Sequence, residues 1–250
     1  MHNPMILRLE HGADLTDTDR TKLAELSASW HSAEAKIDLI REYEEPEHVR
    51  IVLEGFACRY KILANGRRSI VAFLVPGDFC DLHVPILGEM DHSIGTITSC
   101  KVVEISHPAI NDVTERFPRI ARALWWSSLV DEGTLRAWLA TMGQLPADKQ
   151  MAHLFCELHL RLKVVGYVSG TTFPMPMSQE DLADALGIST VHANRVLQQL
   201  REDGLVVLRG KMLTIPDPER LTEFAEFHPN YLHLNRKSKL GRAMPEEPVT

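Results

Sequence analysis

Four residues whose side chains commonly bind metal ions lie in one short stretch of the chain: Cys80, His83, Asp91 and His92. Thiolate, imidazole and carboxylate groups suit zinc and other transition metals, and the Cys80-x-x-His83 spacing is compatible with such a site. Alternate residues of a strand point to opposite faces, so this spacing alone does not bring the four together. We therefore assign no metal ligands from the sequence, and we keep a metal, haem or redox site through Cys80, His83 and His92 as an alternative.

The motifs of common enzymes are missing from the sequence. It contains no G-x-S-x-G, no P-loop and no H-E-x-x-H, and the His-x-His pair of a cupin-type metalloenzyme is absent. A cupin-like metalloenzyme is therefore the least favoured interpretation, and we predict that the chain is not an enzyme. The thiols of Cys58, Cys80 and Cys100 are candidates for redox sensing only if they are exposed, because exposure and a low pKa make a thiol reactive.

The strongest pattern lies at residues 178–202. Ser178 is a helix cap, and Asp181, three residues later, completes a capping box. Gly187 supplies the left-handed turn that ends the first helix, and Ser189 caps the second. The side chains expected to face inward are Leu182, Ala183, Leu186, Ile188, Ala193, Val196, Leu197 and Leu200. Small and apolar residues in this register predict a helix-turn-helix, with an ordinary helical hairpin as the alternative.

The following residues extend this unit. Gly204 ends the second helix, and two short apolar runs around Arg209-Gly210 predict a β-hairpin that ends before Pro216. A helix-turn-helix with such a hairpin is a winged helix, and in DNA-binding modules of this type the second helix enters the major groove. A winged helix that binds another protein instead of DNA is the alternative.

The outward face of the second helix carries the side chains that suit DNA. Arg195 is a candidate for a bidentate contact to guanine, or else for a surface ion pair, and Asn194 suits adenine or is solvated. Val191 offers an apolar contact, and His192 contacts phosphate or only water. The expected DNA-binding residues are Ser178, Gln179, Thr190, Val191, His192, Asn194, Arg195, Gln198 and Arg209. The phosphate candidates among them are Ser178, Gln179, Gln198 and Arg209.

The first half of the chain has a different pattern. Thr16 and Asp19 predict a capped helix over residues 15–26. Short β-like runs fill residues 37–105, and Asn65-Gly66 predicts a type I′ hairpin, in which both central residues have positive φ. These strands predict an antiparallel sandwich or jelly-roll-like barrel, so the expected fold class is α+β.

Residues 118–144 predict a helix of roughly 40 Å at 1.5 Å per residue. Gly143 and Pro146 mark its end, and a second helix is expected at 147–162. Apolar residues at intervals of three and four form a stripe that packs on the chain's own sheet or joins two copies of the chain. We favour a homodimer. The expected dimer contacts are Ile120, Leu124, Leu135, Trp138 and Met142.

The composition is that of a globular protein, with 250 residues, 44% hydrophobic residues and a net charge of −7. Residues 1–150 hold 16 Lys and Arg against 22 Asp and Glu, whereas residues 151–215 hold six of each. The winged-helix segment is thus neutral and does not repel a polyanion. Without an export signal, a C-x-x-C pair or a membrane-length apolar run, we predict a cytoplasmic protein with no membrane association.

The β-rich part, the long helix and the winged helix together resemble the Crp–Fnr superfamily of bacterial transcription regulators over residues 30–216. The most specific part is Met177–Ile215, and Gly55 and the run Val75-Pro76-Gly77-Asp78-Phe79 match the family's β-roll turns. The resemblance implies a homodimer that binds a twofold-related double-stranded DNA operator. If the protein is an activator, the resemblance also implies contact with RNA polymerase. The expected segments are an N-terminal helical segment (1–29), a cyclic-nucleotide-binding-like β-roll (30–110), a dimerisation helix (111–145), a winged helix-turn-helix domain (146–227) and a C-terminal tail (228–250).

The departures from the family pattern concern the effector. Cyclic-AMP binders use a Glu and an Arg-Ser pair to hold ribose and phosphate, whereas Asp81 and His92-Ser93 stand here. An N-terminal cysteine cluster is also missing, so the sequence argues against cyclic AMP and an iron–sulfur cluster, and the effector is unknown or absent. The residues expected at an effector site are Asp81, His83, His92 and Ser93. Val191 stands where the recognition helix usually has Glu, so a different base preference is expected there.

Overall fold

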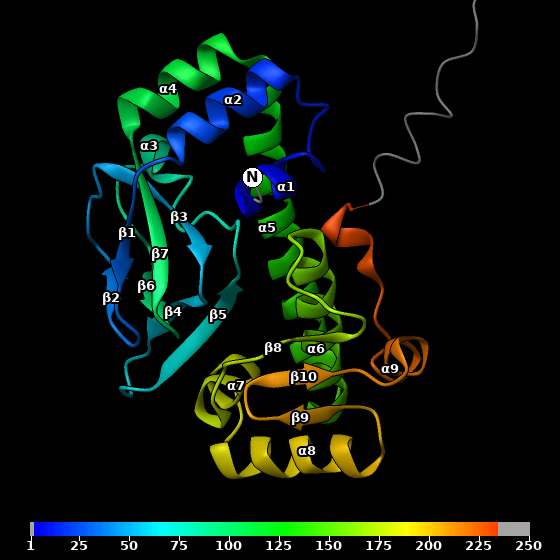
Figure 1. Ribbon diagram of the computed structural model, residues 1–250. Coiled ribbons are helices and arrows are strands. Elements are labelled where there is room, and N and C mark those ends of the chain that lie inside the picture. Colours follow the sequence, from blue (N-terminus) through cyan, green and yellow to red (C-terminus); the bar gives the residue numbers. More distant parts are fainter. Residues whose placement is uncertain (1–2, 235–250) are drawn as a thin grey trace, which may run out of the picture.

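The computed structural model describes residues 3–234, with a β-rich N-terminal part and a mainly helical C-terminal part (Figure 1). The helices are α1 (Pro4–Leu9), α2 (Asp17–Leu26), α3 (Val84–Leu87), α4 (His107–Arg116), α5 (Pro118–Gln144), α6 (Ala147–Val164), α7 (Gln179–Leu186), α8 (Thr190–Glu202), α9 (Pro218–Phe224) and the 3-10 turn η1 (Pro229–Leu232). The strands are β1 (Trp30–Ala33), β2 (Asp38–Ile40), β3 (His48–Glu54), β4 (Ala57–Ile62), β5 (Arg68–Leu74), β6 (Ser93–Thr96), β7 (Cys100–Ser106), β8 (Thr172–Pro174), β9 (Val207–Arg209) and β10 (Met212–Thr214). No helix within residues 3–234 combines the length and the apolar composition needed to cross a bilayer.

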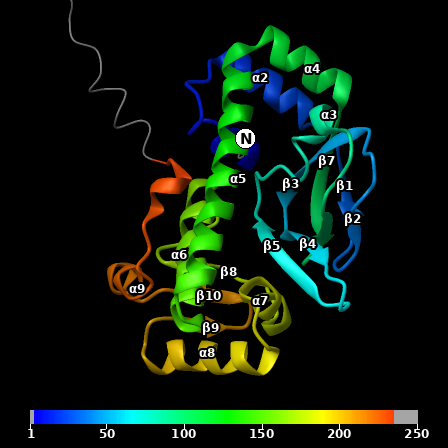
Figure 2. The ribbon, with the colours of Figure 1, turned by 180° about the vertical axis from the view of Figure 1, so that it is seen from behind.

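Two antiparallel sheets form the N-terminal domain. Within the described residues their strand orders are β1-β7-β3 and β2-β6-β4-β5, and Figure 2 shows α5 running alongside them. Val49 and Ile51 alternate along β3 and are fully shielded, and they pack in one cluster with Val103 of β7. Apart from the β4-β5 hairpin, strands that are neighbours in these sheets are not consecutive in sequence, as in a roll. The predicted α+β class with a β-roll is therefore confirmed.

The hairpin between β4 and β5 forms at the predicted place, but its turn differs from the expectation. Gly66 has a φ of +78°, whereas Asn65 is not among the residues with positive φ. The amide of Gly66 donates to the carbonyl of Leu63 at 2.8 Å, and the amide of Leu63 donates to the carbonyl of Arg67 at 2.9 Å. These bonds describe a three-residue loop with a bulge at glycine instead of a type I′ turn. Such a loop needs only one residue of positive φ, whereas a type I′ turn needs two.

Helices at the N-terminus cover one end of the roll. The capping box of α2 is confirmed, because Thr16 Oγ1 accepts from the amide of Asp19 and the Asp19 carboxylate accepts from the amide of Thr16. Helix α1 was not expected from the sequence, and it begins where the Asn3 side chain accepts from two backbone amides. A Cβ on Gly77, which has a φ of +94°, would lie 2.6 Å from the carbonyl oxygen of Pro4. Glycine at this turn therefore lets α1 approach the roll closely.

Helix α5 has the predicted bounds, but its buried face corrects the expected dimer contacts. Ile120, Leu124 and Trp138 are buried in the chain's own core, and the indole Nε1 of Trp138 donates to Glu157 at 2.9 Å. They are not available to a partner, because the roll and α6 already cover them. Leu135 and Met142 are both 44% exposed and remain open to a partner.

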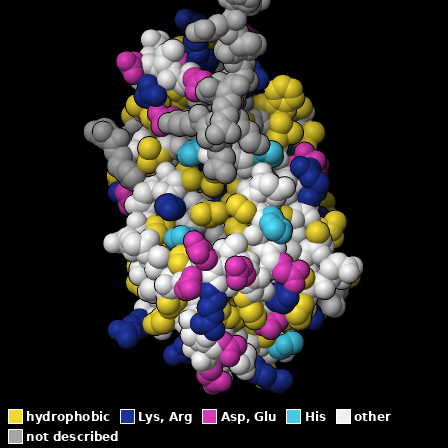
Figure 3. Space-filling model, turned by 90° about the vertical axis from the view of Figure 1, so that its right-hand side faces the viewer, with side chains coloured by type: hydrophobic (Ala, Val, Ile, Leu, Met, Phe, Trp, Pro, Cys, Tyr) yellow, Lys and Arg dark blue, Asp and Glu magenta, His cyan; other side chains and the backbone are white. Residues whose placement is uncertain are grey.

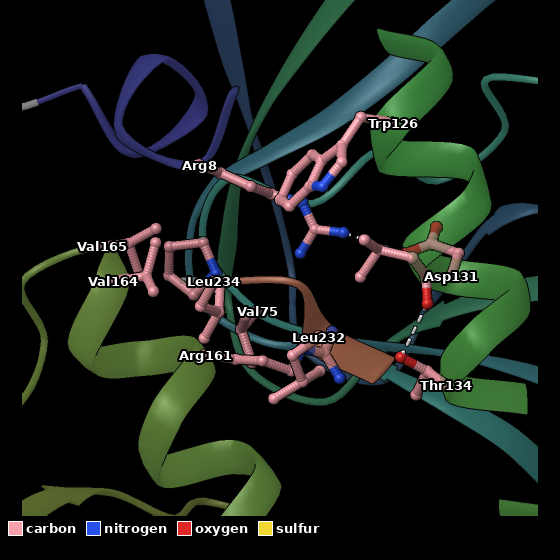
Figure 4. A pocket seen from close by; sticks show the side chains of 12 residues that line it. Arg8, Val75, Trp126, Asp131, Thr134, Arg161, Val164, Val165, Leu232 and Leu234 are labelled. Carbon is pink, nitrogen blue, oxygen red and sulfur yellow. Dashed lines mark hydrogen bonds and ion pairs between the residues drawn. The ribbon is translucent and has the colours of Figure 1, made fainter. Parts of the chain in front are cut away.

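Buried charges connect the roll to the helices, and Figure 4 shows Arg8, Asp131 and Arg161 around a small pocket there. Asp78, in the turn after β5, accepts from Arg8 and also from Arg161 of α6 at 2.5 Å. Arg8 also pairs with Asp131 of α5 at 2.9 Å, and Asp131 pairs with Arg59 of β4 at 3.0 Å. Loss of one partner would leave an uncompensated buried charge, so this network fixes the roll against α5 and α6.

The C-terminal tail expected at 228–250 begins with packed residues. Leu232 of η1 is 1% exposed, and the hydroxyl of Tyr231 donates to Glu157 of α6 at 2.9 Å. Residues 228–234 therefore belong to the folded body, and residues 235–250 of the expected tail lie outside the described part of the chain.

Candidate nucleic-acid interface and effector site

The helix-turn-helix is built by the local signals that the sequence carries. Ser178 Oγ accepts from the amide of Asp181 at 3.1 Å, and the Asp181 carboxylate accepts from the amide of Ser178 at 2.8 Å. Gly187 ends α7 in the left-handed region with a φ of +67°. Ser189 then caps α8 by accepting from the amide of His192 at 3.2 Å. The two helices therefore begin and end as predicted.

The inner face of the helix pair agrees with the predicted register. The buried side chains are Leu182, Ala183, Leu186, Ala193, Val196, Leu197 and Leu200. Ala183 is 2% exposed where α7 and α8 pack, and Ile188 is half-buried at the corner. A larger side chain at Ala183 would separate the two helices, because the interior has no spare volume there.

The outer face of α8 is open to solvent. Thr190, Val191, His192, Arg195 and Gln198 are exposed, and Val191 is 73% exposed. Asn194 is half-buried, because its side-chain oxygen accepts from Gln179 Nε2 of α7 at 3.2 Å. With this bond in place, the amino group of Asn194 can still donate a hydrogen bond, and the exposed side-chain carbonyl of Gln179 can still accept one.

Arg195 has no ion pair with another residue in the described range. The alternative of a surface ion pair for this guanidinium therefore finds no support, and its five N–H donors stay free. An exposed guanidinium in this state suits the two acceptors on the major-groove edge of guanine.

The predicted wing is present and has one strand more than expected. Strands β9 and β10 pair antiparallel on either side of Gly210, and β8 joins β10 on its other edge. Arg209, at the end of β9, and Lys211 are both exposed. Ser178 is exposed as well, so the candidate phosphate contacts of the helix pair and of the wing are accessible.

Helix α8 lies at the end of the molecule opposite to α2 and α4 (Figure 1). The space-filling view shows basic and acidic side chains interspersed towards this end (Figure 3). Acidic side chains among the basic ones weaken the nonspecific attraction of such a surface to phosphate.

Sequence reasoning missed the contact that anchors α7 to the roll. Arg68 of β5 pairs with Asp181 and Asp184 of α7, both at 2.7 Å. Asp181 therefore has two roles, as the capping-box acid and as a partner of the roll. No local pattern signals these pairs, because Arg68 lies more than 100 positions before both aspartates in the chain.

Two of the expected effector residues, Asp81 and Ser93, accept hydrogen bonds from backbone amides. The side chain of Asp81 is fully buried, and its Oδ1 accepts from the amide of Arg50 at 2.7 Å. Burial raises the pKa of the Asp81 carboxyl to about 7. The hydroxyl of Ser93 accepts from the amide of Glu42 at 3.0 Å. Both side chains therefore hold neighbouring backbone in place.

His83 and His92 do lie together, with ring centroids 5.7 Å apart. Burial lowers the pKa of both rings, so both are neutral near pH 7. The Asp91 carboxylate lies 2.6 Å from Nδ1 of His92. The two rings and this carboxylate are the part of the expected effector site that the fold brings together.

The cysteines do not form a reactive centre. All four, Cys58, Cys80, Cys100 and Cys156, are buried free thiols. Burial raises the pKa of Cys58 to about 12 and that of Cys100 to about 11, and it also raises the pKa of Cys80. Because the thiolate is the reactive form, burial disfavours the redox alternative through Cys80.

Comparison with known proteins gives matches in both halves of the chain. Residues 31–117 match the cyclic nucleotide-binding domain, and residues 149–224 match the Crp-like helix-turn-helix domain. The nitrogen fixation regulation protein FixK of Bradyrhizobium diazoefficiens is 28% identical over 70% of this chain and 72% of that protein. The transcriptional activator protein FnrL of Cereibacter sphaeroides is 25% identical over 87% of this chain and 89% of that protein.

The solved structures include the same fold. FixK2 from Bradyrhizobium japonicum aligns with a TM-score of 0.71 and 23% identity, over 78% of this chain and 96% of that one. This likeness confirms the arrangement of a roll, connecting helices and a helix-turn-helix.

Proposed function

Because the chain belongs to the Crp–Fnr superfamily of transcription regulators, we propose that it binds a twofold-related DNA operator as a homodimer. The recognition helix is α8, and the residues that contact DNA are Ser178, Gln179, Thr190, Val191, His192, Asn194, Arg195, Gln198 and Arg209. As a DNA-binding regulator it would act in the cytoplasm, and as an activator it would contact RNA polymerase. The segments for these roles are 30–110 for sensing, 111–145 for dimerisation and 146–227 for DNA binding.

One observation carries the proposal. Helix α8 presents an exposed face with an unpaired guanidinium at Arg195, next to the amide pair of Asn194 and Gln179. Arginine suits guanine, and a side-chain amide suits adenine. Val191 adds an apolar surface that fits a thymine methyl group, and it cannot accept a hydrogen bond from cytosine as a carboxylate would.

The proposed dimer contact is the exposed side of α5. Trp125, Leu129 and Leu139 are 70%, 48% and 76% exposed. At 100° per residue they fall within an arc of roughly 80°, and Leu135 and Met142 lie next to one edge of this arc. A second copy of α5 is the occupant that we propose, because the stripe continues over about 25 Å of one long helix.

The effector of the sensor domain is not a cyclic nucleotide in this proposal. Cyclic phosphate needs a charge-assisted donor, and His92 stands where the related cyclic-AMP binders have arginine. Burial lowers the pKa of the His92 ring, so this side chain is neutral near pH 7 and supplies no compensating charge.

Binding to DNA selected from a random duplex library tests the proposal. The wild-type chain is expected to enrich one sequence. Arg195→Ala is expected to bind that sequence at least about fivefold more weakly, which corresponds to the lower end of one bidentate guanine contact. Arg116→Ala, on the exposed surface of α4, is the matched control and is expected to bind as the wild type does. An unchanged affinity and base preference in Arg195→Ala would refute the assigned role of this residue.

A further inference from the structure

Three side chains with metal-ligand chemistry converge at the edge of the roll. His83 directly precedes α3, and Asp91 and His92 directly precede β6. Each of the three offers one ligand atom, and these atoms all lie within 4.8 Å of one another. Two separate loops of the roll thus bring together two imidazoles and a carboxylate. This is the set that zinc and neighbouring transition metals accept.

The two imidazoles each hold an unsatisfied nitrogen. Nε2 of His83 and Nε2 of His92 are shielded from solvent, and neither has a hydrogen-bond partner in residues 3–234. A buried polar nitrogen without a partner costs free energy in the folded state. A cation that both Nε2 atoms bind would satisfy the two of them together.

Asp91 fixes the orientation of one of the rings. Its Oδ1 lies 2.6 Å from Nδ1 of His92. An ionised carboxylate only accepts hydrogen bonds, so the proton of this imidazole lies on Nδ1 and the lone pair lies on Nε2. A carboxylate that holds a histidine in this tautomer is the usual outer partner of a metal-binding imidazole.

The positive charges near the cluster are already neutralised. Lys61 pairs with Glu42 at 2.7 Å and donates to the backbone carbonyl of Asp91 at 2.7 Å. Arg59 pairs with Asp131 at 3.0 Å and donates to the carbonyl of Phe79 at 2.7 Å. Neither cation has to be displaced for a metal ion to approach. The side chain of Asp91 is 83% exposed, which leaves a path for the ion and for water ligands.

We propose that His83, His92 and Asp91 form a binding site for one divalent transition-metal ion of the zinc or cobalt type in the sensor domain. The two Nε2 atoms are the primary ligands. Asp91 orients His92 through Nδ1 as an outer partner, and water completes the coordination. The site replaces the alternative through Cys80, whose thiol is buried in a separate core cluster. The metal site does not depend on DNA binding, so its test is independent of the test of the proposed function.

Titration of the metal-free full chain with Co²⁺ and Zn²⁺ tests this site. Wild type is expected to bind one ion per chain, with visible d–d absorption in the cobalt form and competition with a chromophoric chelator in the zinc form. His83→Asn and His92→Asn are each expected to weaken binding at least tenfold. Asp91→Asn is expected to weaken it between 10- and 100-fold, as loss of an outer partner does elsewhere. His31→Asn, an exposed histidine of β1, is the matched control and should bind as wild type does.

Circular dichroism of each variant establishes that it is folded, and Asp91→Asn keeps the test valid even if a histidine variant unfolds, because this side chain is exposed. The absence of stoichiometric binding by wild type would overturn the proposal. Undiminished binding by the folded double variant His83→Asn/His92→Asn would overturn it as well.

Discussion

Substitution of one exposed apolar residue of α5 by a charged residue tests the proposed dimer interface. Leu139 is 76% exposed in the isolated chain. Burial of a whole leucine side chain contributes about 1.5–3 kcal/mol, so burial of three quarters of it contributes roughly 1–2 kcal/mol. A twofold axis brings this residue into the interface from both chains. Leu139→Glu therefore removes roughly 2–4 kcal/mol, and dimerisation weakens about 30- to 1000-fold, before the cost of desolvating two carboxylates is added.

Sedimentation velocity over a dilution series measures this change. Wild type is expected to sediment as a dimer at micromolar concentration, and Leu139→Glu as a monomer. Ile62→Glu is the matched control, because Ile62 is 55% exposed at the end of β4 and does not belong to the stripe. A Leu139→Glu chain that stays dimeric at the same dilution as wild type would refute the stripe as the interface.

Three further predictions concern the operator, the interdomain contact and pH. Val191→Glu is expected to change the base preferred at one position of each half-site towards cytosine, whose amino group donates to a carboxylate, and repeated library selection checks this. Arg68→Ala leaves Asp184 without its partner and is expected to lower the free energy of unfolding, measured in urea, by about 1–2 kcal/mol. Arg116→Ala removes an exposed ion pair and is expected to lower it by less than ~0.5 kcal/mol. Burial raises the pKa of Asp81 from 3.8 to about 7, so this carboxyl loses its proton at a lower pH in the unfolded chain than in the folded chain. The free energy of unfolding is therefore expected to fall by up to about 4 kcal/mol as pH rises from about 4 to about 7. Asp81→Asn keeps the bond from the Arg50 amide and should lack this dependence, whereas identical pH profiles of unfolding would contradict the buried-acid explanation.

The helix-turn-helix could be predicted from the sequence because its signals are local. Ser178 and Asp181 are three residues apart, and Gly187 marks the end of α7 by its backbone preference alone. Each signal therefore acts within one or two turns of helix, and none depends on the rest of the fold.

The face of α5 that stays exposed was only partly predictable, because a periodic apolar stripe does not show which surface covers it. Ile120 and Trp138 have helical spacing, but they face the side of α5 opposite to Trp125 and pack inside the chain. The sequence shows both faces of α5 as apolar. Only the position of the roll and of α6 decides which face is left open.

The effector site was the least predictable part. Asp81 and His92 stand where the cyclic-AMP binders have residues for ribose and phosphate, but the carboxylate of Asp81 accepts from the backbone of β3. The convergence of His83 with His92 depends on the pairing of distant strands. The links of Asp78 to Arg8 and Arg161 have the same origin, because contacts between residues 70 and 83 positions apart leave no local pattern.

The central claim is that two copies of this chain bind a twofold-symmetric operator through α8. The most direct measurement is the sequence and stoichiometry of the complex with duplex DNA selected from a random library by the full chain. We predict an inverted repeat with half-site centres about one helical turn apart, bound by two chains. A selected sequence without twofold symmetry, bound by a single chain, or no enrichment at all, would contradict the claim.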